Sequence, residues 1–266
     1  MRIVVCIKPV PDSEAPASVF SVENVNKVVI ADYIPWLIGP YEESAIEAAL
    51  QLKDRHDCEV ILLCLGSSAH QEKIIEALAT GADRAVWIVH EENSRIDSFG
   101  TAYALAEAIR AIGDVDLVLC GRQAADTDSG IVGPALAALL RCASIAVARK
   151  VDFDEEKLIV HQQAGDDIQV LEVSLPAVIS VTSENYTLRY ASLANIMTAM
   201  GKDFKLWELS DLGLSNDLLR EEYSMTTCIR AEVLDPIVTC KIIAGHDEEE
   251  LVSNLLSELR MISIFK

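Results

Sequence analysis

The 266-residue sequence is short of positive charge, with 22 Lys and Arg against 42 Asp and Glu and a net charge of −20. Binding to nucleic-acid phosphates needs clustered Lys and Arg, so this balance argues against a nucleic-acid partner. The longest apolar runs, such as residues 60–65, fall far below the roughly 20 residues of a membrane helix. The amino terminus lacks the apolar core and cleavage site of a signal peptide, so we expect a cytoplasmic protein.

Motifs for metal binding and catalysis are also missing. No two of the seven cysteines show CxxC spacing, so we expect no metal site. Cys6, Cys64 and Cys120 lie in strongly apolar segments and are expected to be buried thiols. No GxSxG, HExxH, GxGxxG or Walker A motif occurs. The five histidines stand beside no obvious nucleophile and are expected on the surface, so we expect no catalytic residues.

Apolar periodicity in the first two-thirds of the chain alternates between strand and helix. Short apolar runs rich in β-branched residues predict buried strands, and apolar positions on one face predict helices. The predicted elements, in chain order, are a strand at 3–7, a helix at 42–55, a strand at 60–65, a helix at 71–79, a strand at 85–89, a helix at 98–112, a strand at 117–120 and a helix at 131–140. This order predicts a parallel sheet with helices on both faces.

The pattern changes in the last third. Further strands are predicted at 143–152, 157–163, 168–173 and 177–182, the first three separated by turn residues and therefore antiparallel. A short helix is predicted to start at 195–197 and an acidic one to cover 248–259. No internal repeat or low-complexity linker is visible. We therefore interpret the chain as one α/β domain, residues 1–204, followed by a C-terminal arm, residues 205–266.

The loop after the predicted strand 117–120 is the most informative segment. It is polar, carries three glycines and leads directly into a predicted helix. Small residues let a phosphate approach backbone amides, and a helix N-terminus favours negative charge. Thr127 or Ser129 could donate to phosphate oxygens, and Asp126 or Asp128 could cap the helix or bind a ribose hydroxyl. Because ligands bind beyond the carboxyl ends of parallel strands, this loop is a candidate nucleotide site, with an ordinary capped connection as the alternative.

Four segments together match one known family in their order and spacing. Residues 8–12 read Lys-Pro-Val-Pro-Asp, close to Lys-x-Val-Pro-Asp, and residues 121–134 follow Gly-Arg-Gln-Ala-x-Asp and end in Val-Gly-Pro. Residues 188–197 contain Arg-Tyr-x-x-Leu-x-Asn-Ile-Met, and Gly-Ala-Asp-Arg at 81–84 also fits. Over roughly residues 1–214 the chain resembles the electron-transfer flavoprotein beta subunit family.

The resemblance implies a doubly wound, mostly parallel α/β sheet of the adenine-nucleotide alpha-hydrolase-like type, with antiparallel additions and a C-terminal arm that embraces a partner. That partner would be the electron-transfer flavoprotein alpha subunit, which carries most contacts to a redox-active FAD. The beta subunit would hold AMP or a second FAD. With a second FAD, the heterodimer could bifurcate electrons from NADH. The chain would then be an electron-transfer subunit, without catalytic residues of its own, within a larger oxidoreductase complex.

Site residues also follow from the resemblance, position by position. The implied cofactor-binding residues are Cys6, Gly39, Pro40, Tyr41, Glu42, Leu65, Gly121, Arg122, Gln123, Ala124, Ala125, Asp126, Thr127, Asp128, Ser129, Gly130, Ile131 and Val132. A recognition loop near residues 188–200 would dock an acyl-CoA dehydrogenase-like or other flavin dehydrogenase. Its docking residues would be Leu193, Asn195, Ile196 and Met197. The alternative for Leu193 is a small satellite core.

Two positions depart from the family pattern. Gly39 stands where the family usually has Asn, and Ile131 stands where bifurcating members usually have Gln. The choice between AMP and FAD therefore stays open. Two other functions also stay open: an adenine-nucleotide-binding hydrolase or signalling module on the same scaffold, and a structural partner with a degenerate nucleotide site.

Overall fold

The computed structural model describes residues 1–12, 14–23, 28–30, 34–90, 96–154, 157–233 and 240–262. Its main sheet contains β1 (Arg2–Ile7), β6 (Glu59–Gly66), β7 (Arg84–Val89), β8 (Leu117–Gly121), β9 (Ala143–Asp154), β10 (Lys157–Ala164), β11 (Asp167–Val173), β12 (Ala177–Val181) and β13 (Asp203–Glu208). Two small sheets contain β2 (Pro9–Pro11) with β5 (Trp36–Ile38), and β3 (Ser21–Glu23) with β4 (Val28–Ile30).

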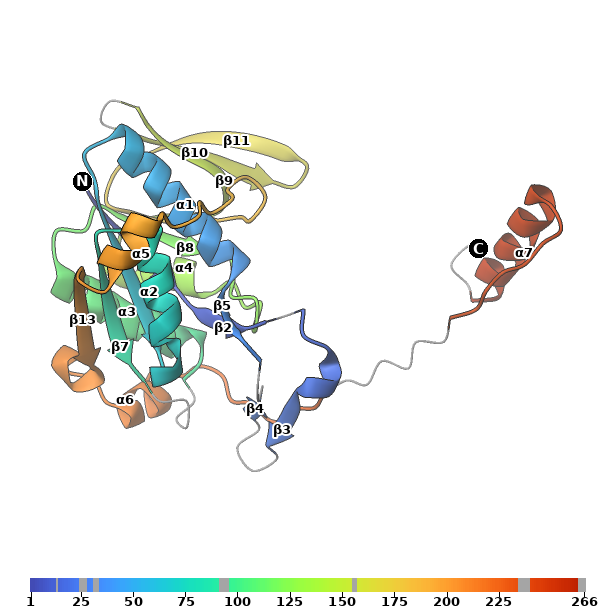
Figure 1. Ribbon diagram of the computed structural model, residues 1–266, viewed down its shortest axis with the longest axis horizontal. Coiled ribbons are helices and arrows are strands. Elements are labelled where there is room, and N and C mark those ends of the chain that lie inside the picture. The colour runs from blue at the N-terminus through green and yellow to red at the C-terminus, as the bar shows by residue number, and fades with distance from the viewer. Residues whose placement is uncertain are drawn as a thin grey trace.

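The strands of the main sheet follow the order β11-β10-β9-β12-β8-β1-β6-β7-β13. All neighbouring strands from β9 to β13 in this order pair in parallel, whereas β10 pairs antiparallel with both β9 and β11. The predicted doubly wound, mostly parallel α/β fold with antiparallel additions is therefore confirmed (Figure 1).

Helices cover both faces of this sheet. On one face lie α1 (Pro40–Arg55) and α2 (Gln71–Ala79), and on the other lie α3 (Ser98–Ile112) and α4 (Val132–Leu140). The remaining helical elements are α5 (Leu193–Ala199), α6 (Asn216–Glu221), α7 (Glu248–Met261) and the 3-10 turns η1 (Ala17–Val19), η2 (Ser68–His70) and η3 (Leu209–Leu212). Successive residues of a strand point to opposite faces. Ile3 of β1 packs in the core beneath α1 and α2, and Val4 packs in the core beneath α3 and α4. In both cores, the burial of apolar strand residues is the main contribution to the stability of the fold.

Some local expectations differ from the structure. Helix α1 begins at Pro40 rather than Glu42, because the fixed φ of proline suits the first helical position. His70 and His90 are buried, so their expected surface position is wrong. The ring of His70 packs edge-on against Trp36, with 4.4 Å between ring centroids. Cys6, Cys64 and Cys120 are buried as expected.

The order of the strands reverses direction beside β1. Helix α1 leads from β1 to β6 and α2 leads on to β7, and α3 then returns the chain to β8 on the other side of β1. The loops that leave β1 and β8 therefore diverge toward opposite faces. Such a switch point opens a crevice at the carboxyl ends of the two strands, where ligands bind in open α/β sheets.

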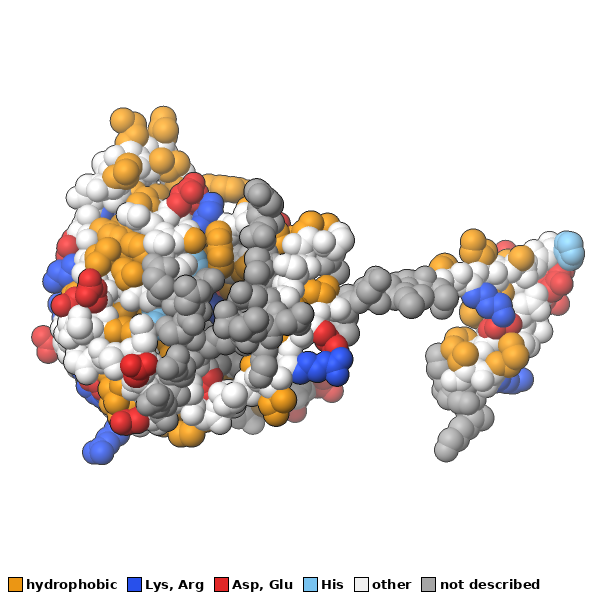
Figure 2. All heavy atoms as spheres, turned by 90° about the horizontal axis from the view of Figure 1, so that it is seen from below, with side chains coloured by type: hydrophobic (Ala, Val, Ile, Leu, Met, Phe, Trp, Pro, Cys, Tyr) orange, Lys and Arg blue, Asp and Glu red, His pale blue; other side chains and the backbone are white. Residues whose placement is uncertain are grey.

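The chain beyond α6 is mostly exposed. Helix α7, at the right of Figure 1, buries none of its described residues. Figure 2 shows hydrophobic side chains along it, and the exposed ones on its first turns are Leu251, Val252, Leu255 and Leu256. Within the described ranges, the helices are all too short or too polar to cross a membrane.

Candidate functional site

The crevice between β1 and β8 brings together residues from separate parts of the chain. Cys6 lies beside Cys120 in the parallel register of β1 and β8. Cys64 lies beside Ile7 in the register of β1 and β6, so Leu65 follows at the same edge of the sheet. The implied site residues of β1, β6 and β8 are thus neighbours at the carboxyl ends of three adjacent strands.

Gly121 joins this edge to the first turn of α1. A Cβ atom at Gly121 would lie 2.8 Å from the Cβ of Tyr41, 2.9 Å from its carbonyl carbon and 3.1 Å from the backbone nitrogen of Glu42. A residue with a side chain would need backbone to move, so this close approach requires glycine. The segments 39–42 and 121–132, far apart in sequence, are therefore in direct contact.

The loop after β8 folds back on itself. The backbone N–H groups of Thr127 and Asp128 donate to the carbonyl of Ala124 at 3.3 and 2.9 Å. Gln123 Nε2 donates to Asp128 Oδ1 at 2.8 Å. Asp128 and Gly130 adopt positive φ angles of 50° and 62°. The Asp128 side chain thus supports the loop, so the suggestion that it caps the following helix is wrong.

The N-terminus of α4 faces this loop without a cap. Its N-cap residue is Ile131, and no side-chain cap bonds to its amides in the described structure. Asp126, the other expected cap, instead forms an ion pair with Lys8 at 2.6 Å. Ser129 Oγ lies 2.8 Å from Ser98 Oγ at the start of α3. The first amides of a helix have no intrahelical acceptor and carry partial positive charge, so this end fits a nucleotide phosphate.

Glu42 adds a buried carboxyl to the crevice. It is the third residue of α1 and only 5% exposed, and its Oε2 atom has no hydrogen-bond partner among the described residues. Burial raises the pKa of Glu42 to about 7, although its own backbone N–H and Lys8 act to lower it. A buried polar atom without a partner is costly, and perturbed groups of this kind gather at binding sites. The sequence alone predicts Glu42 only as one member of a turn.

The predicted docking loop, residues 188–200, presents an apolar surface. Its exposed apolar side chains are Tyr190, Leu193, Ile196, Met197 and Met200. Leu193 is 75% exposed, so its burial in a satellite core is wrong. Ser192 caps α5 by accepting from the backbone N–H of Asn195 at 3.1 Å, and Asn195 itself is half-buried. The cap holds the apolar side chains of α5 on a formed helix, which lies beside α2 (Figure 1).

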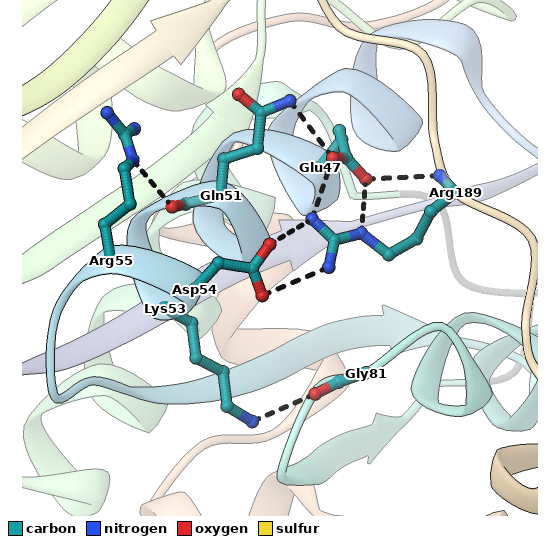
Figure 3. A network of polar contacts seen from close by, with 7 residues as sticks. All are labelled: Glu47, Gln51, Lys53, Asp54, Arg55, Gly81 and Arg189. Carbon is teal, nitrogen blue, oxygen red and sulfur yellow. Dashed lines mark hydrogen bonds and ion pairs between the residues drawn. The ribbon is translucent and has the colours of Figure 1, made fainter.

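Arg189 fixes the start of this loop to α1 (Figure 3). Its Nε and Nη2 atoms each donate to Glu47 at 3.0 Å, and its backbone N–H donates to the same carboxylate at 3.1 Å. Nη2 also donates to Asp54 at 2.8 Å. Burial raises the pKa of Glu47, but hydrogen bonds from Arg189 and Gln51 outweigh this and lower it overall. We define Arg189, Glu47 and Asp54 as the arginine clamp.

The sequence offers only a weak signal for the arginine clamp. Glu47 and Asp54 are seven residues apart, which places two carboxylates on the same face of a helix. Their shared cation follows 142 residues after Glu47. Sequence reasoning therefore missed both acidic partners, although Arg189 belongs to a motif that it singled out.

Two open hollows lie away from the crevice. One is at the amino edge of the sheet, where Arg2 and Glu59 already form an ion pair at 2.7 Å. The other lies between β7 and η3 and includes His90 and Glu208. In the part of the chain that the structure describes, no three His, Cys, Asp or Glu side chains are grouped to hold a metal ion. Neither hollow combines an uncapped helix end with a buried unpaired group.

Comparisons with known proteins agree with this arrangement. Residues 27–212 match the family described as "Electron transfer flavoprotein domain". The chain is 32% identical over 261 residues to caffeyl-CoA reductase-Etf complex subunit CarD of Acetobacterium woodii, with 98% of each chain covered. It is 30% identical over 260 residues to electron transfer flavoprotein subunit beta of Thermoanaerobacterium thermosaccharolyticum, covering 97% of this chain and 98% of the relative. It is 34% identical over 223 residues to protein FixA of Azorhizobium caulinodans, covering 81% and 78%. The chain therefore belongs to the electron transfer flavoprotein family, as a member of its beta subunit type.

Proposed function

We propose that this chain holds an adenine nucleotide, AMP or FAD, at the crevice between β1 and β8 and carries electrons together with an alpha subunit. The observation that supports this most is the meeting of three features at one crevice: the uncapped end of α4, the buried carboxyl of Glu42 and the close contact at Gly121. The adenine lies against the strand ends near Cys6 and Leu65. The phosphates lie against the amides of residues 129–132, because those of Thr127 and Asp128 already donate to the carbonyl of Ala124.

The chain's own residues bind and orient the nucleotide. FAD, when bound, supplies the electron-transfer chemistry, and the protein positions it and controls its surroundings. Lys8 stays engaged with Asp126, so backbone amides rather than a lysine neutralise the phosphates. No residue of the crevice is needed as a nucleophile or base in this function.

The C-terminal arm, proposed over residues 205–266, embraces the alpha subunit. It begins within β13, whose pairing with β7 anchors it to the sheet. Its helix α7 carries exposed apolar residues at 251, 252, 255 and 256, a spacing that forms one stripe on a helix. An amphipathic helix that buries nothing in its own chain gains stability by covering that stripe on a partner.

The docking loop receives a flavin dehydrogenase of the acyl-CoA type. Its exposed Leu193 and Met197 stand on a capped helix held by the arginine clamp, a rigid base for docking. One relative is named as a subunit of a caffeyl-CoA reductase complex, which supports a partner that acts on a CoA thioester. Apolar anchors that fill a partner pocket dominate docking energy in such interfaces.

Co-expression with the alpha subunit tests the proposed function. We expect a yellow heterodimer whose nucleotides are extracted with acid and quantified by chromatography. One FAD with one AMP per heterodimer identifies a simple carrier. Two FAD identify a bifurcating complex, in which NADH reduces the beta flavin. A colourless monomer that hydrolyses ATP would contradict the proposal and favour the hydrolase alternative.

Leu193→Ala should weaken electron transfer to the dehydrogenase and leave the flavin content intact. Loss of the anchor is expected to raise the KM for the partner about tenfold, equal to ~1.4 kcal/mol. Steady-state reduction by the dehydrogenase measures this, and Val170→Ala, an exposed apolar residue of β11 outside both the docking loop and the C-terminal arm, is the control. Lost flavin with unchanged KM would show that the loop has another role.

A further inference from the structure

We propose that Lys202 is a positioning residue for docking: it ties the end of the docking loop to α2 and to the turn after it, residues 80–84, and so fixes the direction in which α5 faces its partner. This inference rests on the proposed docking function. It adds a residue that acts through Leu193 and its neighbours rather than by touching the dehydrogenase. The turn contains the Gly-Ala-Asp-Arg motif at 81–84, to which the proposed function gives no role.

The apolar side chains of α5 and its C-cap form one stripe along the helix. Leu193, Ile196, Met197 and Met200 stand at positions i, i+3, i+4 and i+7, and each is more than half exposed. This spacing places all four on a single helical face. Such a stripe fits a partner pocket in one orientation only, so the direction of α5 determines how well it docks.

Helix α5 does not hold this direction by itself. It has seven residues, and only Ala199 among its described residues is buried. Isolated helices shorter than about 12 residues are marginally stable in water, so α5 depends on what fixes its two ends. The arginine clamp holds the chain before α5. With one end fixed, a short helix can still swing about that end.

Lys202 supplies the second fixed point. It lies three residues beyond Ala199, and its backbone N–H donates to the Ala199 carbonyl at 3.2 Å. Its Nζ atom donates to the carbonyl of Ala82 at 2.6 Å and to that of Leu78 at 3.1 Å. Lys202 therefore joins the C-terminal end of α5 to the C-terminal end of α2.

The C-terminal end of α2 is a good acceptor for a cation. The last carbonyls of a helix carry partial negative charge, and α2 has no basic residue in its own last turn. Lys202 brings this charge from 124 residues beyond Leu78. Burial, together with the nearby ammonium of Lys53, lowers the pKa of Lys202, so its charge costs stability in the folded chain. The position that Lys202 imposes, rather than a gain in stability, accounts for a charge at this place.

The turn that receives Lys202 is itself fixed to the central sheet. Gly81 adopts a φ angle of 142°, a conformation that favours glycine. The backbone N–H of Asp83 donates to the carbonyl of Val60 in β6 at 2.9 Å, and the Asp83 carboxylate accepts from the Val60 N–H at 2.8 Å. A turn tied to a buried strand in this way gives the docking loop a rigid base.

A second lysine reaches the same turn but uses other acceptors. Lys53 of α1 donates through Nζ to the Gly81 carbonyl at 3.0 Å (Figure 3) and pairs with Asp83 at 2.6 Å. These partners leave the carbonyl of Ala82 to Lys202. The turn is thus held by one ammonium group from α1 and one from the end of the docking loop.

Steady-state electron transfer between the dehydrogenase and the full heterodimer tests this role. Lys202→Met keeps an unbranched apolar side chain and removes the N–H donors. We expect the KM for the dehydrogenase to rise about tenfold, with kcat changed less than about twofold and flavin content unchanged. Hydrogen exchange at residues 193–201 should become at least about tenfold faster, while exchange in β7 stays the same. Lys157→Met, the same charge change at an exposed site on β10, is the control and should alter none of these values.

A double-mutant cycle separates positioning from direct contact. If Lys202 acts by directing Leu193, adding Lys202→Met to Leu193→Ala should raise KM by less than about twofold. The KM ratio of Lys202→Met to the unmodified chain should also be the same at about 50 mM and about 300 mM salt. Additive effects, or a ratio that shrinks with salt, would show that Lys202 meets the dehydrogenase itself and would overturn the inference.

A conservative variant keeps the test independent of one substitution. Lys202→Arg retains a cation with donors for both carbonyls, so its KM should stay within about threefold of the unmodified value. An equal rise in Lys202→Arg and Lys202→Met would show that these hydrogen bonds do not position the loop.

The failure of this inference and that of the proposed docking function give different results. An unchanged KM in Lys202→Met, where Leu193→Ala does raise KM, would remove the role of Lys202 and leave the docking loop standing. An unchanged KM in Leu193→Ala would instead contradict docking through this loop.

Discussion

Gly121→Ala is expected to empty the nucleotide site while the main sheet stays folded. The added methyl group would meet the backbone of Tyr41 and Glu42 at 2.9 and 3.1 Å, and backbone atoms cannot rotate away as a side chain can. The start of α1 must therefore shift from the end of β8. Overpacking of this kind costs roughly 1–3 kcal/mol, which lowers the melting temperature, and the nucleotide extracted from the heterodimer should fall at least about tenfold.

Gly133→Ala is the matched control for this change. A Cβ there would lie 3.4 Å from the Cβ of Ser180, a tolerable side-chain contact between α4 and β12. Gly133 is the second residue of α4, where alanine is at least as favourable as glycine, so we expect no loss of stability and unchanged nucleotide content. Full nucleotide retention in Gly121→Ala would show that the segments 39–42 and 121–132 do not form the site together.

Arg189→Gln is expected to release the docking loop and to slow electron transfer to the dehydrogenase at least about tenfold, by raising KM. The substitution leaves Glu47, whose side chain is 6% exposed, without its cation. Removing one partner of a fully buried pair costs ~3–5 kcal/mol, and the 35% exposure of Arg189 reduces this to roughly 2–3 kcal/mol. Nucleotide content should not change, because Glu47 and Asp54 lie beyond the first turn of α1, which is the part that borders the crevice.

Arg55→Gln provides the control, because Arg55 also lies on α1 but pairs with Asp152 on the exposed surface.

The stability lost in Arg189→Gln should depend on pH. The pKa of Glu47 is lowered in the folded chain, so its stabilisation is present above its unfolded pKa of about 4.3 and disappears as pH falls through the folded value. Urea unfolding at pH 7 and pH 3 measures this, and an equal loss at both values would show that charge pairing is not the cause.

The core elements could be predicted because their own residues specify them. The run at 60–65 is apolar throughout, as a strand covered on both faces must be, and it forms the centre of β6. Elements that depend on partners were harder to predict. Strand β2 contains two prolines, which cannot donate ladder hydrogen bonds, and it forms only because β5 pairs with it. Strand β13 lies at an edge, with a buried pattern too weak to distinguish it from loop.

The residues of the candidate site also fall into those that the sequence predicts and those that depend on contacts with distant segments. The loop 121–132 could be recognised from its glycines and its position before a helix. The approach of Gly121 to Tyr41, and of Arg189 to Glu47, joins residues that local pattern cannot relate, because neither pair shares an element. The raised pKa of Glu42 likewise follows from burial, and burial is a property of the folded chain.

Helix α1 touches the nucleotide crevice at its first turn and the docking loop through Glu47 and Asp54. Its 16 residues form one unbroken helix, so the spacing of Glu42, Glu47 and Asp54 along it sets the separation of the two sites. One residue inserted between Glu42 and Glu47 would turn everything beyond it by about 100° and point both carboxylates of the arginine clamp away from Arg189. Side chains on the outer face of α1 can therefore be exchanged, but inserting or deleting one residue between Glu42 and Glu47 would break one of the two sites.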